Sequence, residues 1–422
     1  MFSRREFLYG AGAAAALLNA PRIDARQQQE LPPSIRALTS MRSQMRPITA
    51  DERRVRVEKA RRLMAEQKID AVMLCQGTSL VYFTNIRWGG GERLFACIIP
   101  GKGEPFFVCP AFEEDRAREQ IALGPFGGTA DVRTWHEHES PYERVAQGLR
   151  DRGITTGKLG IEERIDFVFS DGVRSAASGI TAVSATPITA GCRMIKDAHE
   201  LELMRLASAV TLKAYDAAYR ALKEGMTQND FAHLVESAHA QLGFEGGAGV
   251  QVGEYSALPH GSIAPQTIRE GTILLIDGGC DVGGYQSDLS RTFVLGKPTA
   301  KMRAVFDIER KAQDAALAAA KPGVPCEQVD AAARKIIVDA GYGPDYKYFT
   351  HRVGHGMGMD GHEWPYLVRG NKLPLAPGMT FSDEPGIYLR GEFGVRLEDD
   401  MYITEDGAKL FTPQSESLDK PF

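Results

Sequence analysis

The segment from Leu274 to Val294 constrains the fold most strongly. It begins with an apolar run, passes through a glycine-rich middle and ends in β-branched and aromatic residues. This pattern predicts a β-hairpin, because glycine supplies the positive φ angles that a reversal needs. With the turn centred on Val282-Gly283, Asp277 and Asp288 become cross-strand partners with Cβ atoms about 5 Å apart on one face. Carboxylates that close repel each other, so the hairpin is either half of a cation site or a solvated acidic turn.

Length and composition bound the remaining possibilities. A chain of 422 residues predicts two or three domains, and its 43% hydrophobic and 25% charged residues are typical of a soluble globular protein. The net charge of −5 leaves no basic field for a polyanion, so we expect no nucleic-acid partner and no stable membrane insertion. The six cysteines show no Cys-x-x-Cys spacing, and we expect no disulfide framework.

The N-terminal residues are typical of a targeting segment. Ser3-Arg4-Arg5-Glu6-Phe7-Leu8 precedes an apolar run of small residues from Tyr9 to Leu18, which predicts a twin-arginine signal peptide over residues 1–25. The run is shorter than the roughly 20 residues of a membrane span. We therefore expect export to the periplasm or the exterior, with a frayed helix carrying two chance arginines as the alternative. Residues 26–50 lack periodicity and predict a linker.

Residues 51–189 alternate helical and strand patterns, which predicts a smaller α/β domain. None of its residues has the spacing of a catalytic constellation, and His136 and His138 are best interpreted as solvated surface side chains. The expected helices cover 51–67, 111–121 and 142–151, and the expected strands cover 71–75, 80–84, 94–99, 105–108 and 158–161.

Residues 190–422 change in character and predict an α+β domain. Asp197 with Glu200, and Thr227 with Asp230, have the spacing of capping boxes at two helix starts. Two more helices are expected at 300–320 and 327–340, and a β-rich segment from Tyr348 contains a second hairpin near Gly391. Helices gathered before and between strands argue for α+β and against a doubly wound fold.

Three further stretches carry side chains suited to metal chemistry. The run from His351 to Glu363 places three histidines among four glycines, which core packing does not require. A second stretch, Ser382–Tyr388, contains Glu384. In the third, Gly394–Asp399, the two-residue spacing of Arg396 and Glu398 places both on one face of a strand.

Together these stretches predict a metal centre. Four carboxylates carry about four negative charges, which two divalent cations neutralise. Oxygen ligands with one imidazole suit Mn²⁺, the ion we expect first, as well as Co²⁺, Fe²⁺ or Zn²⁺. Two such ions about 3.5–4 Å apart activate a bridging water and polarise a carbonyl, which is hydrolytic chemistry. The candidate ligands are Asp277, Asp288, His355, Glu384 and Glu398.

This combination resembles the pita-bread metallopeptidases, the family of Xaa-Pro aminopeptidase and Xaa-Pro dipeptidase. All five ligand positions are present, with the eleven-residue step between the aspartates, and Cys192–Ala207 is similar to the stretch that opens the family's catalytic domain. The resemblance covers about residues 51–422. It implies a curved antiparallel sheet in a pita-bread domain at 190–422, a creatinase-like α/β domain before it, a homodimer, and small peptide substrates with proline at the second position.

The resemblance also implies roles for the ligands. Asp277 would chelate one metal, Asp288 and Glu398 would bridge, and His355 and Glu384 would complete the two shells. Glu384 would in addition take the proton of the bridging water.

Other roles fall on the side chains around the metals. His260, in Pro259-His260-Gly261, matches a histidine that holds the substrate and steers protons. His362 would stabilise the tetrahedral oxyanion, and His351 would line the same pocket. Arg396 would orient a bridging carboxylate. Tyr388 belongs either to this pocket or to the core.

The expected reaction is hydrolysis, by a metal-bridging hydroxide, of the bond between an N-terminal residue and proline. A dipeptidase needs a group that binds the free carboxylate, whereas an aminopeptidase needs an open end, and the sequence does not separate them. The alternatives are a lyase or amidase reaction on a small molecule at the same centre, and an inactive metal-binding homologue. Five intact ligands disfavour creatinase, which works without metals, and the large N-terminal domain disfavours methionine aminopeptidase.

Overall fold

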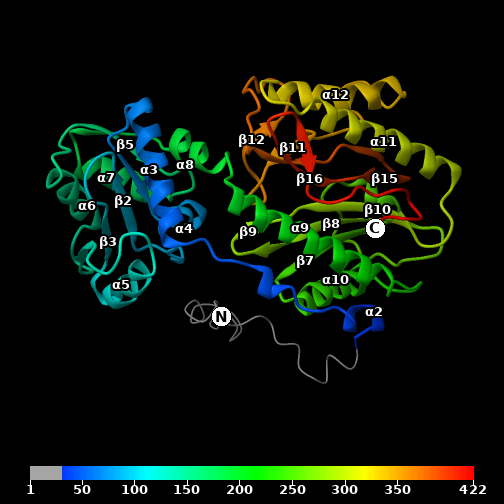
Figure 1. Ribbon diagram of the computed structural model, residues 1–422, viewed down its shortest axis with the longest axis horizontal. Coiled ribbons are helices and arrows are strands. Elements are labelled where there is room, and N and C mark those ends of the chain that lie inside the picture. The colour runs from blue at the N-terminus through cyan, green and yellow to red at the C-terminus, as the bar shows by residue number, and fades with distance from the viewer. Residues whose placement is uncertain (1–30) are drawn as a thin grey trace. The chain divides into compact units, whose positions relative to one another are not determined.

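The computed structural model describes residues 31–422, which form two compact units. One unit is Pro47–Arg193. The other contains Met194–Phe422 together with the described residues up to Arg46. The predicted signal peptide lies outside the described residues, and Figure 1 shows the elements of both units. No helix within residues 31–422 is long and apolar enough to cross a membrane.

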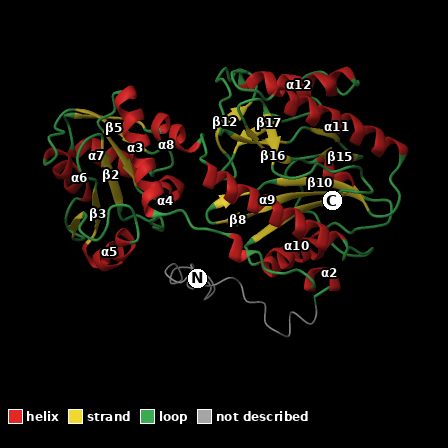
Figure 2. Ribbon diagram, in the orientation of Figure 1, coloured by secondary structure: helices red, strands yellow, loops and turns green. Residues whose placement is uncertain are grey.

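The Pro47–Arg193 unit is built on one six-stranded sheet with the order β4-β3-β2-β1-β5-β6. Figure 2 shows the strands of this unit in yellow and its helices in red. The pairs β1–β5, β5–β6 and β3–β4 are parallel, and β2 runs antiparallel to both of its neighbours. This confirms the predicted α/β domain. Its strands are β1 (Ala71–Leu74), β2 (Ala96–Pro100), β3 (Phe106–Pro110), β4 (Asp131–Trp135), β5 (Gly157–Ile161) and β6 (Ile180–Ser184), and its α-helices are α3 (Ala50–Gln67), α4 (Gly77–Thr84), α5 (Glu114–Ala122), α6 (Pro141–Arg150), α7 (Phe167–Ala176) and α8 (Thr186–Arg193).

One predicted strand in this unit is wrong. Residues 80–84 belong to helix α4, in which the Thr84 hydroxyl donates to the Leu80 carbonyl at 2.6 Å and Asn85 ends the helix with φ 66°. Most of the helix is buried, so its sequence shows no amphipathic period. A short apolar run of that kind does not distinguish a buried helix from a strand.

The predicted linker at 26–50 needs correction beyond residue 30. Pro33–Arg36 forms helix α2, and Arg42–Gln44 forms a 3₁₀ turn. The Ser34 hydroxyl donates to the Ala217 carbonyl at 2.7 Å, and the Met41 amide donates to the Leu242 carbonyl at 2.8 Å. These contacts make the segment part of the C-terminal unit, although it precedes the other unit in sequence.

The C-terminal unit has the predicted α+β composition. Both capping boxes are present, at the starts of α9 (Ala198–Tyr219) and α10 (Gln228–Leu242). These helices pack on a sheet with the order β10-β8-β7, and α11 (Ala300–Ala319) and α12 (Cys326–Asp339) share a second core with the other strands. The strands are β7 (Gly246–Val252), β8 (Ile273–Val282), β9 (Tyr285–Gln286), β10 (Leu289–Val294), β11 (Gly354–Gly356), β12 (Glu363–Leu367), β13 (Thr380–Asp383), β14 (Gly386–Leu389), β15 (Phe393–Arg396), β16 (Asp399–Ile403) and β17 (Ala408–Leu410).

The register of the central hairpin differs from the prediction by two residues. Asp277 pairs with Ser290 and not with Asp288. The turn residues are Gly283 and Gly284, with φ 64° and 91°, because a two-residue turn of this kind needs positive φ at both central positions. A shift of two residues preserves the strand's alternation, so the two aspartates still share a face.

Candidate metal centre

The five predicted ligands come from separate segments of the C-terminal unit. Asp277 lies on β8, Asp288 lies between β9 and β10, and His355 lies on β11. Glu384 directly follows β13, and Glu398 lies between β15 and β16. The strands of two sheets and the β14–β15 hairpin therefore supply the cluster.

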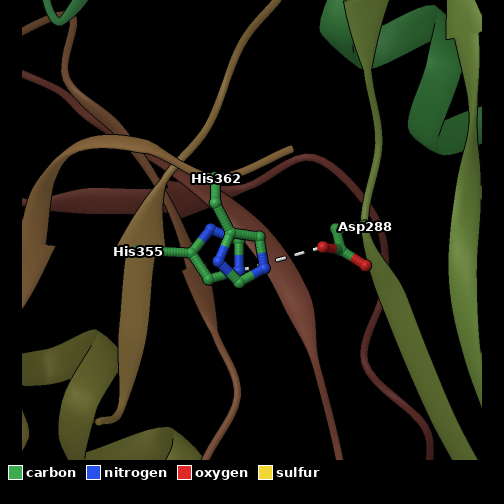
Figure 3. A group of neighbouring side chains, drawn as sticks. All are labelled: Asp288, His355 and His362. Carbon is green, nitrogen blue, oxygen red and sulfur yellow. Dashed lines mark ion pairs between the residues drawn. The ribbon is translucent and has the colours of Figure 1, made fainter. Parts of the chain in front are cut away.

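These side chains converge into three overlapping groups. Their ligand atoms lie within 4.8 Å of one another in each group, which are Asp277–Asp288–Glu398, His355–Glu384–Glu398 and Asp288–His355–His362. Figure 3 shows the third group, with the two imidazole rings stacked and directed toward Asp288. The structure thus brings the side chains of all five predicted ligands together, with the His362 ring beside them.

The hydrogen bonds of His355 prepare it to bind a cation. Its Nδ1 lies 3.1 Å from the Gly356 carbonyl oxygen, which can only accept, so Nδ1 carries the proton. Nε2 then directs a lone pair at Glu384 Oε1, 3.2 Å away, and Asp288 Oδ2, 3.8 Å away. Ligands bound at about 2.0–2.2 Å to one ion lie roughly 3 Å apart, so this spacing fits a shared metal.

The crowding of buried carboxylates in the cluster also favours a bound cation. Burial raises the pKa of Asp288 well above its usual value, and the charges of Asp277, Asp400 and Glu384 add to the effect. Burial and neighbouring carboxylates raise the pKa of Glu398 likewise. Burial opposes the ionisation of Glu384 too, but when both ring nitrogens of His355 carry protons and no metal is bound, the hydrogen bond and the charge of His355 prevail and lower the pKa of Glu384 to about 2. The donor set therefore fits divalent cations.

Arg396 and Ser290 hold two of the carboxylates in place. Arg396 Nη2 lies 2.6 Å from Asp277 Oδ2, and Arg396 Nε donates to the Ser290 hydroxyl at 2.9 Å. The Ser290 Oγ lies 2.8 Å from Asp277 Oδ1 and 2.7 Å from Glu398 Oε2, so its one proton is shared between them. Arg396 was expected to orient a bridging carboxylate; its ion pair is with Asp277, and the Ser290 hydroxyl links it to Glu398.

The sequence interpretation missed two serines. Besides Ser290, Ser382 Oγ accepts from the His355 amide at 3.0 Å and donates to Glu384 Oε1 at 3.2 Å. Each serine stands two residues from a ligand, Asp288 or Glu384, on a strand or at its end. The period of two along a strand was the signal that could have identified both.

His351 and Tyr388 form a fixed pair beside the centre. His351 Nδ1 lies 2.8 Å from the Arg352 carbonyl oxygen, and its Nε2 lies 2.7 Å from the Tyr388 hydroxyl. That hydroxyl also accepts from Arg396 Nη1 at 3.2 Å. Burial raises the pKa of Tyr388, so the hydroxyl stays protonated and donates to His351. Tyr388 is thus both buried in the core and hydrogen-bonded in the site.

His362 stacks on His355, with ring centroids 3.6 Å apart and planes inclined by 17°. Its Nδ1 lies 3.2 Å from Arg352 Nη2, and a guanidinium can only donate, so the ring proton of neutral His362 is on Nε2. Burial, with the charges of His355 and Arg352, lowers the pKa of His362 to about 4. His260 is exposed and belongs to none of the three groups, although the preceding Pro259 carbonyl accepts from Arg396 at 3.0 Å.

Residues 202–405 match metallopeptidase family M24, and residues 56–195 match the creatinase/prolidase N-terminal domain. The chain belongs to metallopeptidase family M24, which confirms the expected enzyme class and two-domain pita-bread architecture.

Three relatives show how far the similarity extends. An Xaa-Pro dipeptidase of Lactobacillus delbrueckii subsp. lactis is 33% identical over 380 residues, covering 86% of this chain and 98% of the relative. The structure of dipeptidase PepE from Mycobacterium ulcerans has a TM-score of 0.81 at 31% identity, covering 89% of this chain and 99% of its own. An X-Pro aminopeptidase from Thermotoga maritima has a TM-score of 0.73 at 27% identity, with 86% and 99% covered.

Proposed function

We propose that this protein hydrolyses the bond between an N-terminal residue and proline in small peptides, using two divalent metal ions. One observation carries the dinuclear part of the proposal. The groups Asp277–Asp288–Glu398 and His355–Glu384–Glu398 have a single member in common, Glu398. One carboxylate that belongs to two ligand sets is suited to bridge two ions. Relatives named Xaa-Pro dipeptidase support the substrate class.

The protein's own residues then have distinct tasks. When bound, the metals supply an activated water and a polarised scissile carbonyl. Glu384 is ionised and accepts a proton from the attacking water. His362 presents its Nε2 proton to the oxygen that develops negative charge. His260, on the loop tied to Arg396 through Pro259, holds the substrate.

The test is metal removal and reloading on the full chain. Protein stripped with a chelator should lose hydrolysis of Ala-Pro and of Ala-Pro-Ala, and should regain it with Mn²⁺ or Co²⁺ at two ions per chain. Metal content by mass spectrometry and rates by amine release give the two readouts. Absence of hydrolysis with every divalent ion would overturn the proposed reaction, and full activity at one ion per chain would overturn the dinuclear centre.

We also propose that the protein is exported by the twin-arginine route and acts as a homodimer in the periplasm or outside the cell. The sequence Ser3–Leu8 supports export, and the family resemblance supports the dimer. Replacing Arg4 and Arg5 together by lysine should retain the protein in the cytoplasm. Light scattering should give twice the 46.2 kDa chain mass, less any cleaved signal.

A further inference from the structure

Side chains of helix α12 hold the backbone on both sides of Arg352 through hydrogen bonds. Arg334 pairs with Asp330 on this helix, with 3.0 Å between Nη2 and Oδ1, and Arg334 also donates to the His351 carbonyl at 2.8 Å. Asp330 Oδ1 accepts from the Val353 amide at 2.9 Å. The backbone on both sides of Arg352 is therefore held by one buried ion pair.

The Arg352 side chain lies beside the metal centre. Its Cζ is 4.1 Å from the centroid of the Tyr366 ring, and its Nη2 is 3.2 Å from His362 Nδ1. Tyr366 pairs with His355 across β11 and β12, and the His362 ring stacks on His355. The guanidinium therefore adjoins the ring that neighbours the candidate metal ligands.

Arg352 differs from the other basic residues near the metal centre because, within residues 31–422, no carboxylate forms an ion pair with it. Arg396 is paired with Asp277 at 2.6 Å, Arg334 with Asp330, and Lys196 with Glu363 at 2.6 Å. Within residues 31–422, the Arg352 side chain contacts an imidazole and an aromatic ring and forms no ion pair. It offers five N–H donors in a planar fork, and His362 takes one of them.

We propose that Arg352 binds a carboxylate of the substrate next to the metal centre. This inference rests on the proposed function and refines its substrate class. A guanidinium fork binds a carboxylate through two parallel hydrogen bonds, and the Tyr366 ring fixes the plane of the fork. The carboxylate is either the free C-terminus of an Xaa-Pro dipeptide, which makes the enzyme a dipeptidase, or the side chain of an acidic first residue.

The experiment compares substrates within each variant of the metal-loaded full chain. We would measure kcat/KM for Ala-Pro, for Ala-Pro amide and for Glu-Pro with wild type, Arg352→Met and Arg352→Lys. The matched control is Arg369→Met, because Arg369 also lies over a tyrosine ring, that of Tyr346, but is already paired with Asp345.

Each outcome has a defined meaning. Loss of charge-assisted hydrogen bonds should lower kcat/KM for Ala-Pro about 10- to 100-fold in Arg352→Met, with a much smaller change for Ala-Pro amide. If the bound carboxylate is instead the acidic side chain of the first residue, kcat/KM of Arg352→Met for Glu-Pro should fall by this factor relative to its kcat/KM for Ala-Pro. Arg352→Lys should retain part of the discrimination. Equal losses on all three substrates would overturn the proposal, because Arg352 would then only position His362.

A binding measurement separates this inference from the proposed reaction. Calorimetric titration with proline, glutarate and prolinamide needs no turnover. Weaker binding of proline or glutarate to Arg352→Met than to wild type, with prolinamide unchanged, supports carboxylate binding even if no Xaa-Pro peptide is cleaved. Identical titrations for both proteins overturn it, whatever the rates show.

Discussion

Both units have apolar cores, but particular strands of the two units bury different kinds of side chains. In Pro47–Arg193, strands β1, β2 and β3 are buried along their whole length and consist of apolar residues and free cysteines. In the C-terminal unit, strands β13 to β16 bury acidic side chains and Arg396. Apolar burial stabilises a fold without a partner, whereas a buried carboxylate costs free energy unless a counter-charge is present. The named strands of the first unit therefore need no counter-charge, whereas the acidic cluster of the second unit does.

Replacing Asp288 by Asn should have the largest effect and tests this comparison directly. Loss of one ligand should lower kcat/KM about 1,000-fold, because bound metal contributes several kcal/mol to the transition state. The free energy of unfolding of the metal-free protein should not fall, since the change removes a buried carboxyl group whose ionisation its burial and its acidic neighbours already oppose. Metal content, rates and urea unfolding give the readouts.

The control for this variant is Asp281→Asn on the same hairpin. Asp281 Oδ1 accepts from the Gly284 amide in the turn and lies outside the three ligand groups. The Asp281→Asn variant should therefore retain both its bound metal and its activity. If Asp288→Asn also kept both, the ligand assignment would be wrong.

Replacing Ser290 by Ala should have a smaller effect of the same kind. The hydroxyl joins Asp277, Glu398 and Arg396, so its loss should weaken metal affinity about 10- to 100-fold, as for other groups that orient ligands. Competition with a chromogenic chelator measures this affinity. Thr292→Val is the control, because the Thr292 hydroxyl lies on the same strand and donates to the Arg396 backbone carbonyl. Thr292 belongs to none of the three groups of candidate metal ligands. A larger loss of affinity in Thr292→Val would contradict the assignment.

The sequence was sufficient where structure depends on neighbouring residues. The capping boxes at Asp197 and Thr227 are local hydrogen-bond patterns and were predicted correctly. The hairpin register was not, because Val282-Gly283 and Gly283-Gly284 both resemble turns, and only the requirement for positive φ at both positions selects the second. Helix α4 was mistaken for a strand because burial on most sides erased its period.

The same distinction applies to the metal centre. The five candidate ligands were predicted because carboxylates and histidines in glycine-rich strands suit no other role as well, and the structure places these side chains close together. The partners of Arg396 could not be found in this way. Its choice of Asp277, and the Ser290 bridge to Glu398, depend on how β8, β10 and β15 lie against one another.

A substitution in the apolar core of the Pro47–Arg193 unit should have the smallest effect on the metal centre. A Cβ at Gly148 on helix α6 would lie 2.2 Å from the Phe106 ring on β3. Gly148→Ala should therefore lower the free energy of unfolding of this unit by about 1–3 kcal/mol through overpacking, while metal content is unchanged. Gly128→Ala, with no heavy atom within 4 Å of its added Cβ, is the matched control. Urea unfolding followed by tryptophan fluorescence suits the test, because Trp88 and Trp135 lie in this unit. A loss of bound metal in Gly148→Ala would show that the apolar unit contributes to the metal centre, and the contrast between the two units would fail.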